Sequence, residues 1–175
     1  MVGNIYTSKT AIFLDRDGLI NETVDRGENC VVQGKKVRFT APWKFSEFKF
    51  KAGVGEALNR LKEAGFLLIL VSNQPDLSYG TLSSRDHGLI MAEVKKMPLD
   101  DIFICPHGRN DGCTCKKPKP GMILEAAKKW GIDLGESYVV GDSVVDIQAG
   151  QSAGCRTILT GDLSVAVDII FSHKI

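Results

Sequence analysis

The sequence predicts a doubly wound α/β fold, in which helices cover both faces of a parallel β-sheet. Short apolar runs without polar interruption recur along the chain, as expected for strands that are buried on both faces. Segments with apolar residues at helical spacing separate these runs. The length of 175 residues fits a single domain, 1–175, with enough chain to bury a substantial core.

The expected elements follow one another in a regular order. Strands are expected at 11–14, 66–71, 101–105, 138–140 and 156–159, with a sixth candidate strand at 167–171. Helices are expected at 53–64, 85–96 and 121–130, and another is expected after Asp142, to about Ala153. Gly65 and Gly131 stand directly after two of these helices, where a helix C-terminus favours glycine. Residues 75–84 have the composition of a loop.

The stretch 19–52 is irregular, and a connection of this length in a compact domain is usually a lid or a binding loop. Part of it is expected to pair as a small hairpin, so we interpret 27–50 as a long loop or small flap. Its aromatic residues could form the apolar underside of a lid, but packing against the core is the favoured interpretation. These residues are Trp43, Phe45, Phe48 and Phe50.

Composition and charge argue against several classes of function. A net charge of +1 gives no broad basic field for nucleic acid, so any anion site has to be local. No apolar stretch has the length of a membrane span, and the N-terminus lacks the pattern of a secretory signal. We therefore expect a cytoplasmic monomer that acts on a small molecule, without a nucleic-acid or membrane partner.

Two carboxylates end the first expected strand. Asp15 and Asp17 stand at positions i and i+2, which point to the same side of an extended chain, and Gly18 then allows a sharp turn. Open α/β sheets bind ligands beyond the carboxyl ends of their strands. Two adjacent acids repel unless a cation lies between them, and hard oxygen ligands favour Mg²⁺. The pair therefore predicts a magnesium site, with an acidic surface turn as the alternative.

Polar side chains also follow the other expected strands. Ser72 and Asn73 end the second strand, Asp142 ends the fourth, and Lys117 precedes a helix. Phosphoryl transfer needs such a set, because its catalysis consists of positioning and of neutralising charge on the phosphoryl oxygens. A carboxylate that forms an aspartyl-phosphate is a suitable nucleophile. Each residue alone could be a turn residue, a solvated charge or a helix N-cap, but their placement at successive strand ends favours phosphoryl transfer.

Three of the five cysteines lie within residues 105–115, which indicates metal binding rather than a disulfide framework. The potential ligands are Cys105, His107, Cys113 and Cys115. Four protein ligands leave no open coordination position, which is typical of a structural Zn²⁺ site and not of a catalytic one. Free cysteines beside an unrelated histidine are the alternative.

The strand-end motifs resemble those of the haloacid dehalogenase (HAD) superfamily of phosphatases. The matching segments are Asp15-x-Asp17-Gly18, Ser72-Asn73-Gln74, Lys117-Pro118-x-Pro120-Gly121-Met122 and Gly141-Asp142-x-x-x-Asp146. The resemblance implies that Asp15 is the nucleophile and that Asp17 is the general acid and base. It implies that Ser72 and Lys117 hold the transferring phosphoryl group. For Mg²⁺ it implies the Asp15 carboxylate, the Asp17 carbonyl and Asp142 as ligands, with Asp146 in a supporting role.

The cysteine cluster narrows this resemblance. A zinc-bearing loop directly before the Lys117 motif is similar to the subfamily of D-glycero-D-manno-heptose 1,7-bisphosphate 7-phosphatases and histidinol-phosphate phosphatases. The resemblance implies a minimal cap, and it implies that Lys116 contributes to substrate recognition. Residues 75–80 depart from the usual sequence of that subfamily, and 27–50 is longer than its usual loop; either difference is compatible with a different substrate.

The first hypothesis is Mg²⁺-dependent removal of the 7-phosphate of a heptose bisphosphate. The enzymatic alternatives are a histidinol-phosphate phosphatase and a nucleic-acid end phosphatase. A catalytically silent relative that binds phosphorylated ligands is the remaining alternative, and it is disfavoured because the expected catalytic acids and lysine are all present. Expected substrate contacts are Asn73, Lys116, Thr23 and Arg26, with Arg109 and Lys44 as alternates for a second phosphate.

Overall fold

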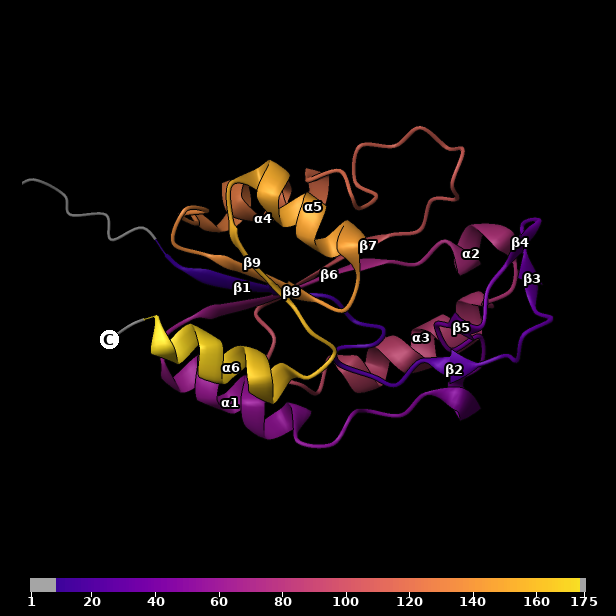
Figure 1. Ribbon diagram of the computed structural model, residues 1–175, viewed down its shortest axis with the longest axis horizontal. Coiled ribbons are helices and arrows are strands. Elements are labelled where there is room, and N and C mark those ends of the chain that lie inside the picture. The colour runs from indigo at the N-terminus through magenta and orange to yellow at the C-terminus, as the bar shows by residue number, and fades with distance from the viewer. Residues whose placement is uncertain (1–8, 174–175) are drawn as a thin grey trace, which may run out of the picture.

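The computed structural model describes residues 9–173, and its centre is a parallel five-stranded sheet in the order β7–β6–β1–β8–β9 (Figure 1). The strands are β1 (Ala11–Leu14), β6 (Leu67–Asn73), β7 (Asp101–Cys105), β8 (Tyr138–Gly141) and β9 (Arg156–Leu159). The chain builds β6 and β7 on one side of β1 before it adds β8 and β9 on the other. This reversal creates a switch point at the carboxyl ends of β1 and β8, where open α/β sheets bind ligands.

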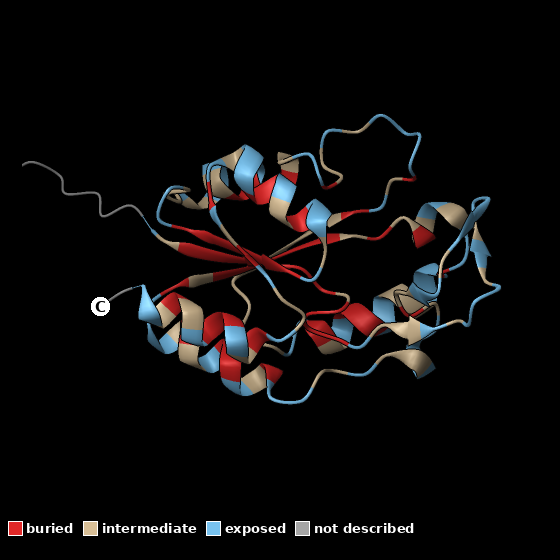
Figure 2. Cartoon of the chain, viewed as in Figure 1, coloured by how far each residue is buried: buried red, intermediate tan, exposed pale blue. Residues whose placement is uncertain are grey.

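Helices cover both faces of the sheet (Figure 1). One face carries α1 (Val54–Glu63), α3 (Ser84–Val94) and α6 (Leu163–Ser172), and the other carries α4 (Gly121–Trp130) and α5 (Val144–Ala153). Along β1, Ile12 and Leu14 pack with the first group, while Ala11 and Phe13 pack with the second. Both faces of this strand are therefore buried (Figure 2), which explains its uninterrupted apolar sequence.

The predicted fold class is confirmed, and the five main strands and four main helices occur with small shifts at their ends. The loop predicted at 75–84 contains one short helix, α2 (Asp76–Tyr79). The sixth strand predicted at 167–171 is wrong, because these residues belong to α6. Its buried residues, at the helical spacing i, i+3, i+4 and i+7, are Leu163, Ala166, Val167 and Ile170. No helix among residues 9–173 is both long enough and apolar enough to cross a membrane.

Residues 24–47 form a small antiparallel structure beside the carboxyl edge of the sheet, which we call the flap (Figure 1). Within it β2 (Val24–Asp25) pairs with β5 (Phe39–Thr40), and β3 (Val31–Val32) pairs with β4 (Lys35–Lys36). The short 3₁₀ helix η1 (Phe45–Glu47) ends the flap. The hairpin expected in this stretch is confirmed, and the two following aromatic residues, Phe48 and Phe50, pack against the core.

Polar contacts anchor the flap at its base. The guanidinium of Arg26 donates to both carboxylate oxygens of Glu47, at 2.6 and 2.7 Å, and lies 3.9 Å from the centre of the Trp43 ring. These hydrogen bonds lower the pKa of Glu47 to about 2. The amide of Phe45 donates to Asp86 Oδ1 at 2.9 Å, which attaches η1 to α3. The flap is therefore an ordered part of the fold.

Candidate active site

Side chains from separate segments meet at the carboxyl edge of the sheet. Asp15 and Asp17 follow β1, Asn73 ends β6, Lys117 precedes α4 and Asp146 lies in the first turn of α5. Together they line an open cleft of about 270 Å³. These segments meet because β1 pairs with both β6 and β8, so their carboxyl ends share one edge.

Lys117 lies between two carboxylates in this cleft. Its Nζ is 2.6 Å from Asp15 Oδ1 and 2.5 Å from Asp146 Oδ1, and it donates to the carbonyl of Val71 at 2.7 Å. Only 4% of Lys117 and 9% of Asp15 are exposed. Burial raises the pKa of Asp15 to about 7, although Lys117 opposes this shift. Burial alone would lower the pKa of Lys117, but the two carboxylates raise it, so the ammonium stays charged.

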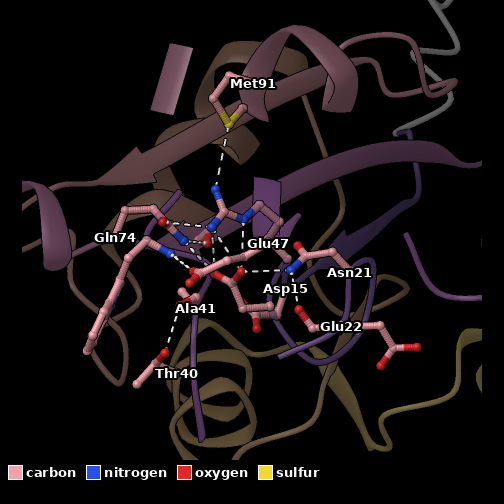
Figure 3. A network of polar contacts seen from close by, with 12 residues as sticks. Asp15, Asn21, Glu22, Thr40, Ala41, Glu47, Gln74 and Met91 are labelled. Atoms are coloured by element: carbon pink, nitrogen blue, oxygen red, sulfur yellow. Dashed lines mark hydrogen bonds and ion pairs between the residues drawn. The ribbon is translucent and has the colours of Figure 1, made fainter. Parts of the chain in front are cut away.

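A buried arginine orients the second acid of the β1 motif. Arg16 is fully buried, and its guanidinium donates to both carboxylate oxygens of Asp17 at 2.9–3.2 Å. Gln74 accepts from Arg16 at 2.8 Å and donates to Asp17 at 2.6 Å, while Asn21 donates to Asp17 at 3.0 Å. Figure 3 shows Gln74 and Asn21 on opposite sides of this network. The sulfur of Met91 lies 3.9 Å from Arg16 Nη1. Donors on several sides therefore fix the Asp17 carboxylate.

The site residues predicted from the sequence did not include Arg16, Asn21 or Gln74, although Gln74 belongs to the Ser72-Asn73-Gln74 motif. A signal existed for Arg16, because an arginine at the end of a buried strand needs a nearby carboxylate to compensate its charge. Gln74 also carried a signal, because it follows Ser72 by two residues and therefore points to the same face of an extended chain. Asn21 gave no such signal, because its approach to Asp17 depends on the turn after β1.

Ser72 and Asn73 occupy different environments. The hydroxyl of Ser72 is buried and accepts a hydrogen bond from Gln74 Nε2 at 2.9 Å. The Asn73 side chain accepts from the backbone N–H of Lys117 and donates to its carbonyl, both at 3.0 Å. Asn73 was expected to contact substrate, but its amide group is engaged by the backbone of Lys117 and holds the loop that carries this lysine.

Three acids approach one another closely enough to hold one cation. Carboxylate oxygens of Asp15, Asp142 and Asp146 all lie within 4.8 Å of one another. Gly18 makes this approach possible, because a Cβ there would lie 1.8 Å from Asp142 Oδ2. Asp142 is only partly exposed, and the partial burial of its carboxylate, with the charge of Asp146, raises its pKa. Oxygen ligands that repel one another fit Mg²⁺, which relieves that repulsion.

The hydrogen bonds of Asp146 distinguish it from the other two acids. One of its oxygens accepts from both the backbone N–H and the hydroxyl of Ser143 in a capping box at the start of α5, and the other pairs with Lys117. Both oxygens are therefore already engaged by the protein.

The second cluster of potential metal ligands lies between β7 and α4. Its ligand atoms come from Cys105, His107, Cys113 and Cys115 and lie within 4.8 Å of one another. The contacts between them range from 3.1 to 3.7 Å. Tetrahedral Zn²⁺ with bonds of about 2.0–2.3 Å separates its ligands by roughly 3.5–3.8 Å. Burial and the neighbouring thiols raise the pKa of Cys115 to about 12, and a bound cation would remove this barrier to deprotonation. The cluster therefore fits zinc.

The expected substrate-contacting cations lie in different places. Lys116 lines the cleft, and its Nζ donates to the carbonyl of His107 at 3.0 Å. Arg26 is paired with Glu47 in the flap, and neither Arg26 nor Thr23 is among the described residues that line this cleft. The alternate Arg109 projects from the loop of the cysteine cluster and lines three neighbouring cavities.

A family model of haloacid dehalogenase-like hydrolases matches residues 4–154. The chain belongs to this family. Among similar proteins, the D-glycero-β-D-manno-heptose-1,7-bisphosphate 7-phosphatase of Pasteurella multocida is 39% identical over 158 residues, covering 83% of this chain and 77% of that protein. The phosphatase of the same name from Haemophilus ducreyi is 35% identical over 162 residues, covering 85% and 81%.

A solved structure of a heptose bisphosphate phosphatase is also similar to this chain. The D,D-heptose 1,7-bisphosphate phosphatase of Bordetella bronchiseptica, crystallised with magnesium and phosphate, has a TM-score of 0.78 and 27% identity to this HAD-like chain. The alignment covers 94% of this chain and 99% of that one. The two folds therefore agree over nearly the full length of both chains.

Proposed function

We propose that this HAD-like hydrolase is a Mg²⁺-dependent phosphatase that removes the 7-phosphate of D-glycero-β-D-manno-heptose 1,7-bisphosphate. The observation that carries the chemistry is the buried contact of Asp15 with Lys117, beside two further acids at the carboxyl edge of the sheet. The heptose substrate rests on the names of relatives that are identical to this chain at more than a third of the aligned positions. A cytoplasmic monomer is part of the same proposal.

In this proposal Asp15 attacks the phosphorus atom, and the bond between phosphorus and the sugar oxygen breaks as Asp17 protonates that oxygen. Asp17 then takes a proton from water, which attacks the phosphorus of the aspartyl-phosphate and releases inorganic phosphate and Asp15. Lys117 and Ser72 hold the equatorial phosphoryl oxygens, whose charge has to be neutralised in the transition state. Arg16, Gln74 and Asn21 keep Asp17 in place through both proton transfers.

The Asp15 carboxylate, the Asp17 carbonyl and Asp142 would hold Mg²⁺. When bound, it supplies positive charge that favours the ionised form of Asp15 and neutralises phosphoryl oxygens. Asp146 supports the site from outside, since its oxygens bind Ser143 and Lys117. We further propose that the 105–115 loop binds a structural Zn²⁺ through Cys105, His107, Cys113 and Cys115.

Phosphate release tests the catalytic assignment. Asp15→Asn should abolish turnover of the heptose bisphosphate, because an amide is a poor nucleophile, and Asp17→Asn should lower kcat about 10²–10⁴-fold. Asp168→Asn is the matched control, since this exposed acid on α6 pairs with Arg60 away from the cleft. Full activity of Asp15→Asn would refute the mechanism.

A substrate panel tests the heptose assignment separately. The wild-type protein should hydrolyse the heptose 1,7-bisphosphate with a higher kcat/KM than histidinol phosphate, other sugar phosphates and a 5′-phosphorylated oligonucleotide. A higher kcat/KM for histidinol phosphate would contradict the substrate while leaving the Asp15 chemistry intact.

A further inference from the structure

A second cavity of about 240 Å³ lies between the flap, α2 and the cysteine-rich loop, and we call it the flap pocket. It shares part of its lining with the active-site cleft, namely Ala41, Pro75, Asp76 and Lys116. A molecule that extends out of the cleft past these shared residues therefore enters the flap pocket.

Cations dominate the charge of the flap pocket. Lys35 lines it from the flap, Arg109 from the cysteine-rich loop, and Lys116 from the shared wall. The acid in its lining, Asp76, is largely buried, and its carboxylate accepts a hydrogen bond from the Thr81 hydroxyl at 2.6 Å. The surplus of positive charge favours an anionic ligand group.

The flap presents Lys35 to the pocket through its turn geometry. The β3–β4 hairpin turns at Gln33 and Gly34, which have φ values of 48° and 74°. Two successive left-handed residues form the tight turn that favours hairpins, and Gln33 is the non-glycine residue that carries this strain. Lys35 and Lys36 follow on opposite faces of β4, and of the two only Lys35 lines the pocket.

The cysteine-rich loop presents Arg109 from the opposite side. The backbone N–H of Arg109 donates to the Tyr79 hydroxyl of α2 at 2.9 Å, and the N–H of Gly108 donates to Asp111 at 2.7 Å. Because Arg109 follows His107 by two residues, the ligand cluster also restrains its backbone. Tyr79 and the 58%-exposed Phe39 add aromatic surface to the pocket wall.

We propose that the flap pocket binds the phosphate that the sugar retains after the reaction, with Lys35 and Arg109 as its counter-charges. This inference rests on the proposed function, because it assigns the second phosphate of a sugar bisphosphate whose first phosphate reacts at Asp15. The aromatic wall accommodates the carbon skeleton between them. The flap thereby selects bisphosphates over monophosphates.

The test compares KM for the heptose 1,7-bisphosphate with KM for the corresponding 7-monophosphate. In Lys35→Ala and in Arg109→Ala, the ratio of the first KM to the second should rise about ten- to a hundredfold, the usual effect of losing a contact to a charged group. Lys36→Ala is the matched control, since it removes an exposed lysine from the other face of the same strand, and its ratio should equal that of the wild type. Circular dichroism establishes that each variant is folded.

An unchanged ratio in both Lys35→Ala and Arg109→Ala would overturn the proposal, as would an equal rise in Lys36→Ala. If the wild-type protein hydrolyses neither heptose compound, the proposed function fails by itself. The same ratio measured with fructose 1,6-bisphosphate and fructose 6-phosphate then decides the flap pocket independently, because it needs only a sugar with a second phosphate.

Discussion

Replacing Lys117 by methionine should destabilise the metal-free protein strongly. Methionine keeps most of the side-chain volume, so the change removes the ammonium without leaving a large cavity. In the wild type this ammonium lies within 2.7 Å of Asp15, Asp146 and the Val71 carbonyl, and the residue is only 4% exposed. The variant therefore leaves two carboxylates close together with no positive charge between them.

The size of the effect follows from this burial. Removing one partner of a buried ion pair costs about 3–5 kcal/mol in the free energy of unfolding. For a chain of this length each kcal/mol corresponds to about 2–4 °C, so the melting temperature should fall by roughly 6–20 °C. Mg²⁺ should restore part of the loss, because it offers the same acids a replacement charge.

Urea unfolding at pH 8 in a metal chelator measures the loss, with Lys128→Met as the control because Lys128 is an exposed lysine on α4. A double-mutant cycle with Asp146→Asn gives the sharper result. The double variant should be more stable than the sum of the single losses predicts, by at least about 1 kcal/mol, since the remaining charges no longer repel. A Lys117→Met loss below about 1 kcal/mol, or additivity within about 0.5 kcal/mol, would refute this reasoning.

Three further predictions concern the surroundings of the site. Stripping zinc, or Cys113→Ser, should lower the melting temperature and open residues 105–115 to proteolysis, because binding energy in such a site is folding energy; unchanged protease resistance would contradict it. Because the folded pKa of Glu47 is about 2 and its ordinary value is 4.5, its pair with Arg26 stabilises the fold above pH 4.5 and loses this contribution as the pH falls toward 2. Glu47→Gln should therefore flatten the dependence of the urea midpoint on pH over that range, and an unchanged slope would argue against it. Arg16→Met should lower kcat at least tenfold and alter the pH–rate profile with little change in KM, since Asp17 loses its fixed orientation. A rise in KM with unchanged kcat would assign Arg16 to substrate binding instead.

The fold was predictable where local patterns and tertiary packing agree. β1 is a buried apolar run at every position, and α4 has both an apolar face and a terminal glycine, so each local signal indicates one structure. The region of α6 was ambiguous because Val167–Phe171 is a short stretch with three β-branched residues, interrupted only by Asp168, and periodicity alone does not assign so short a stretch to a helix or a strand. The helix spacing becomes visible only when Leu163 is included.

The site was less predictable than the fold, because partners in three dimensions decide what a side chain does. Asp15 and Lys117 could be selected from their motifs, but the occupation of the Asn73 amide by the backbone of Lys117 depends on a contact across 44 positions. From the sequence, Arg26 was an equally good candidate to bind a phosphate. In the structure its guanidinium is paired with Glu47, 21 residues away. Spacing along the chain identifies candidate groups but not their competitors for the same hydrogen bonds.

Because β2 pairs with β5, the length of the flap can change without moving the catalytic residues. These two strands bring positions 24–25 and 39–40 together, so the chain enters and leaves the flap at one place. Residues between them can be lengthened, shortened or exchanged at small entropic cost, while Asp15 and the start of α1 keep their positions. The fold is therefore suited to divergence and to engineering, because new substrate ranges can be introduced by grafting flap sequences onto an unaltered catalytic framework.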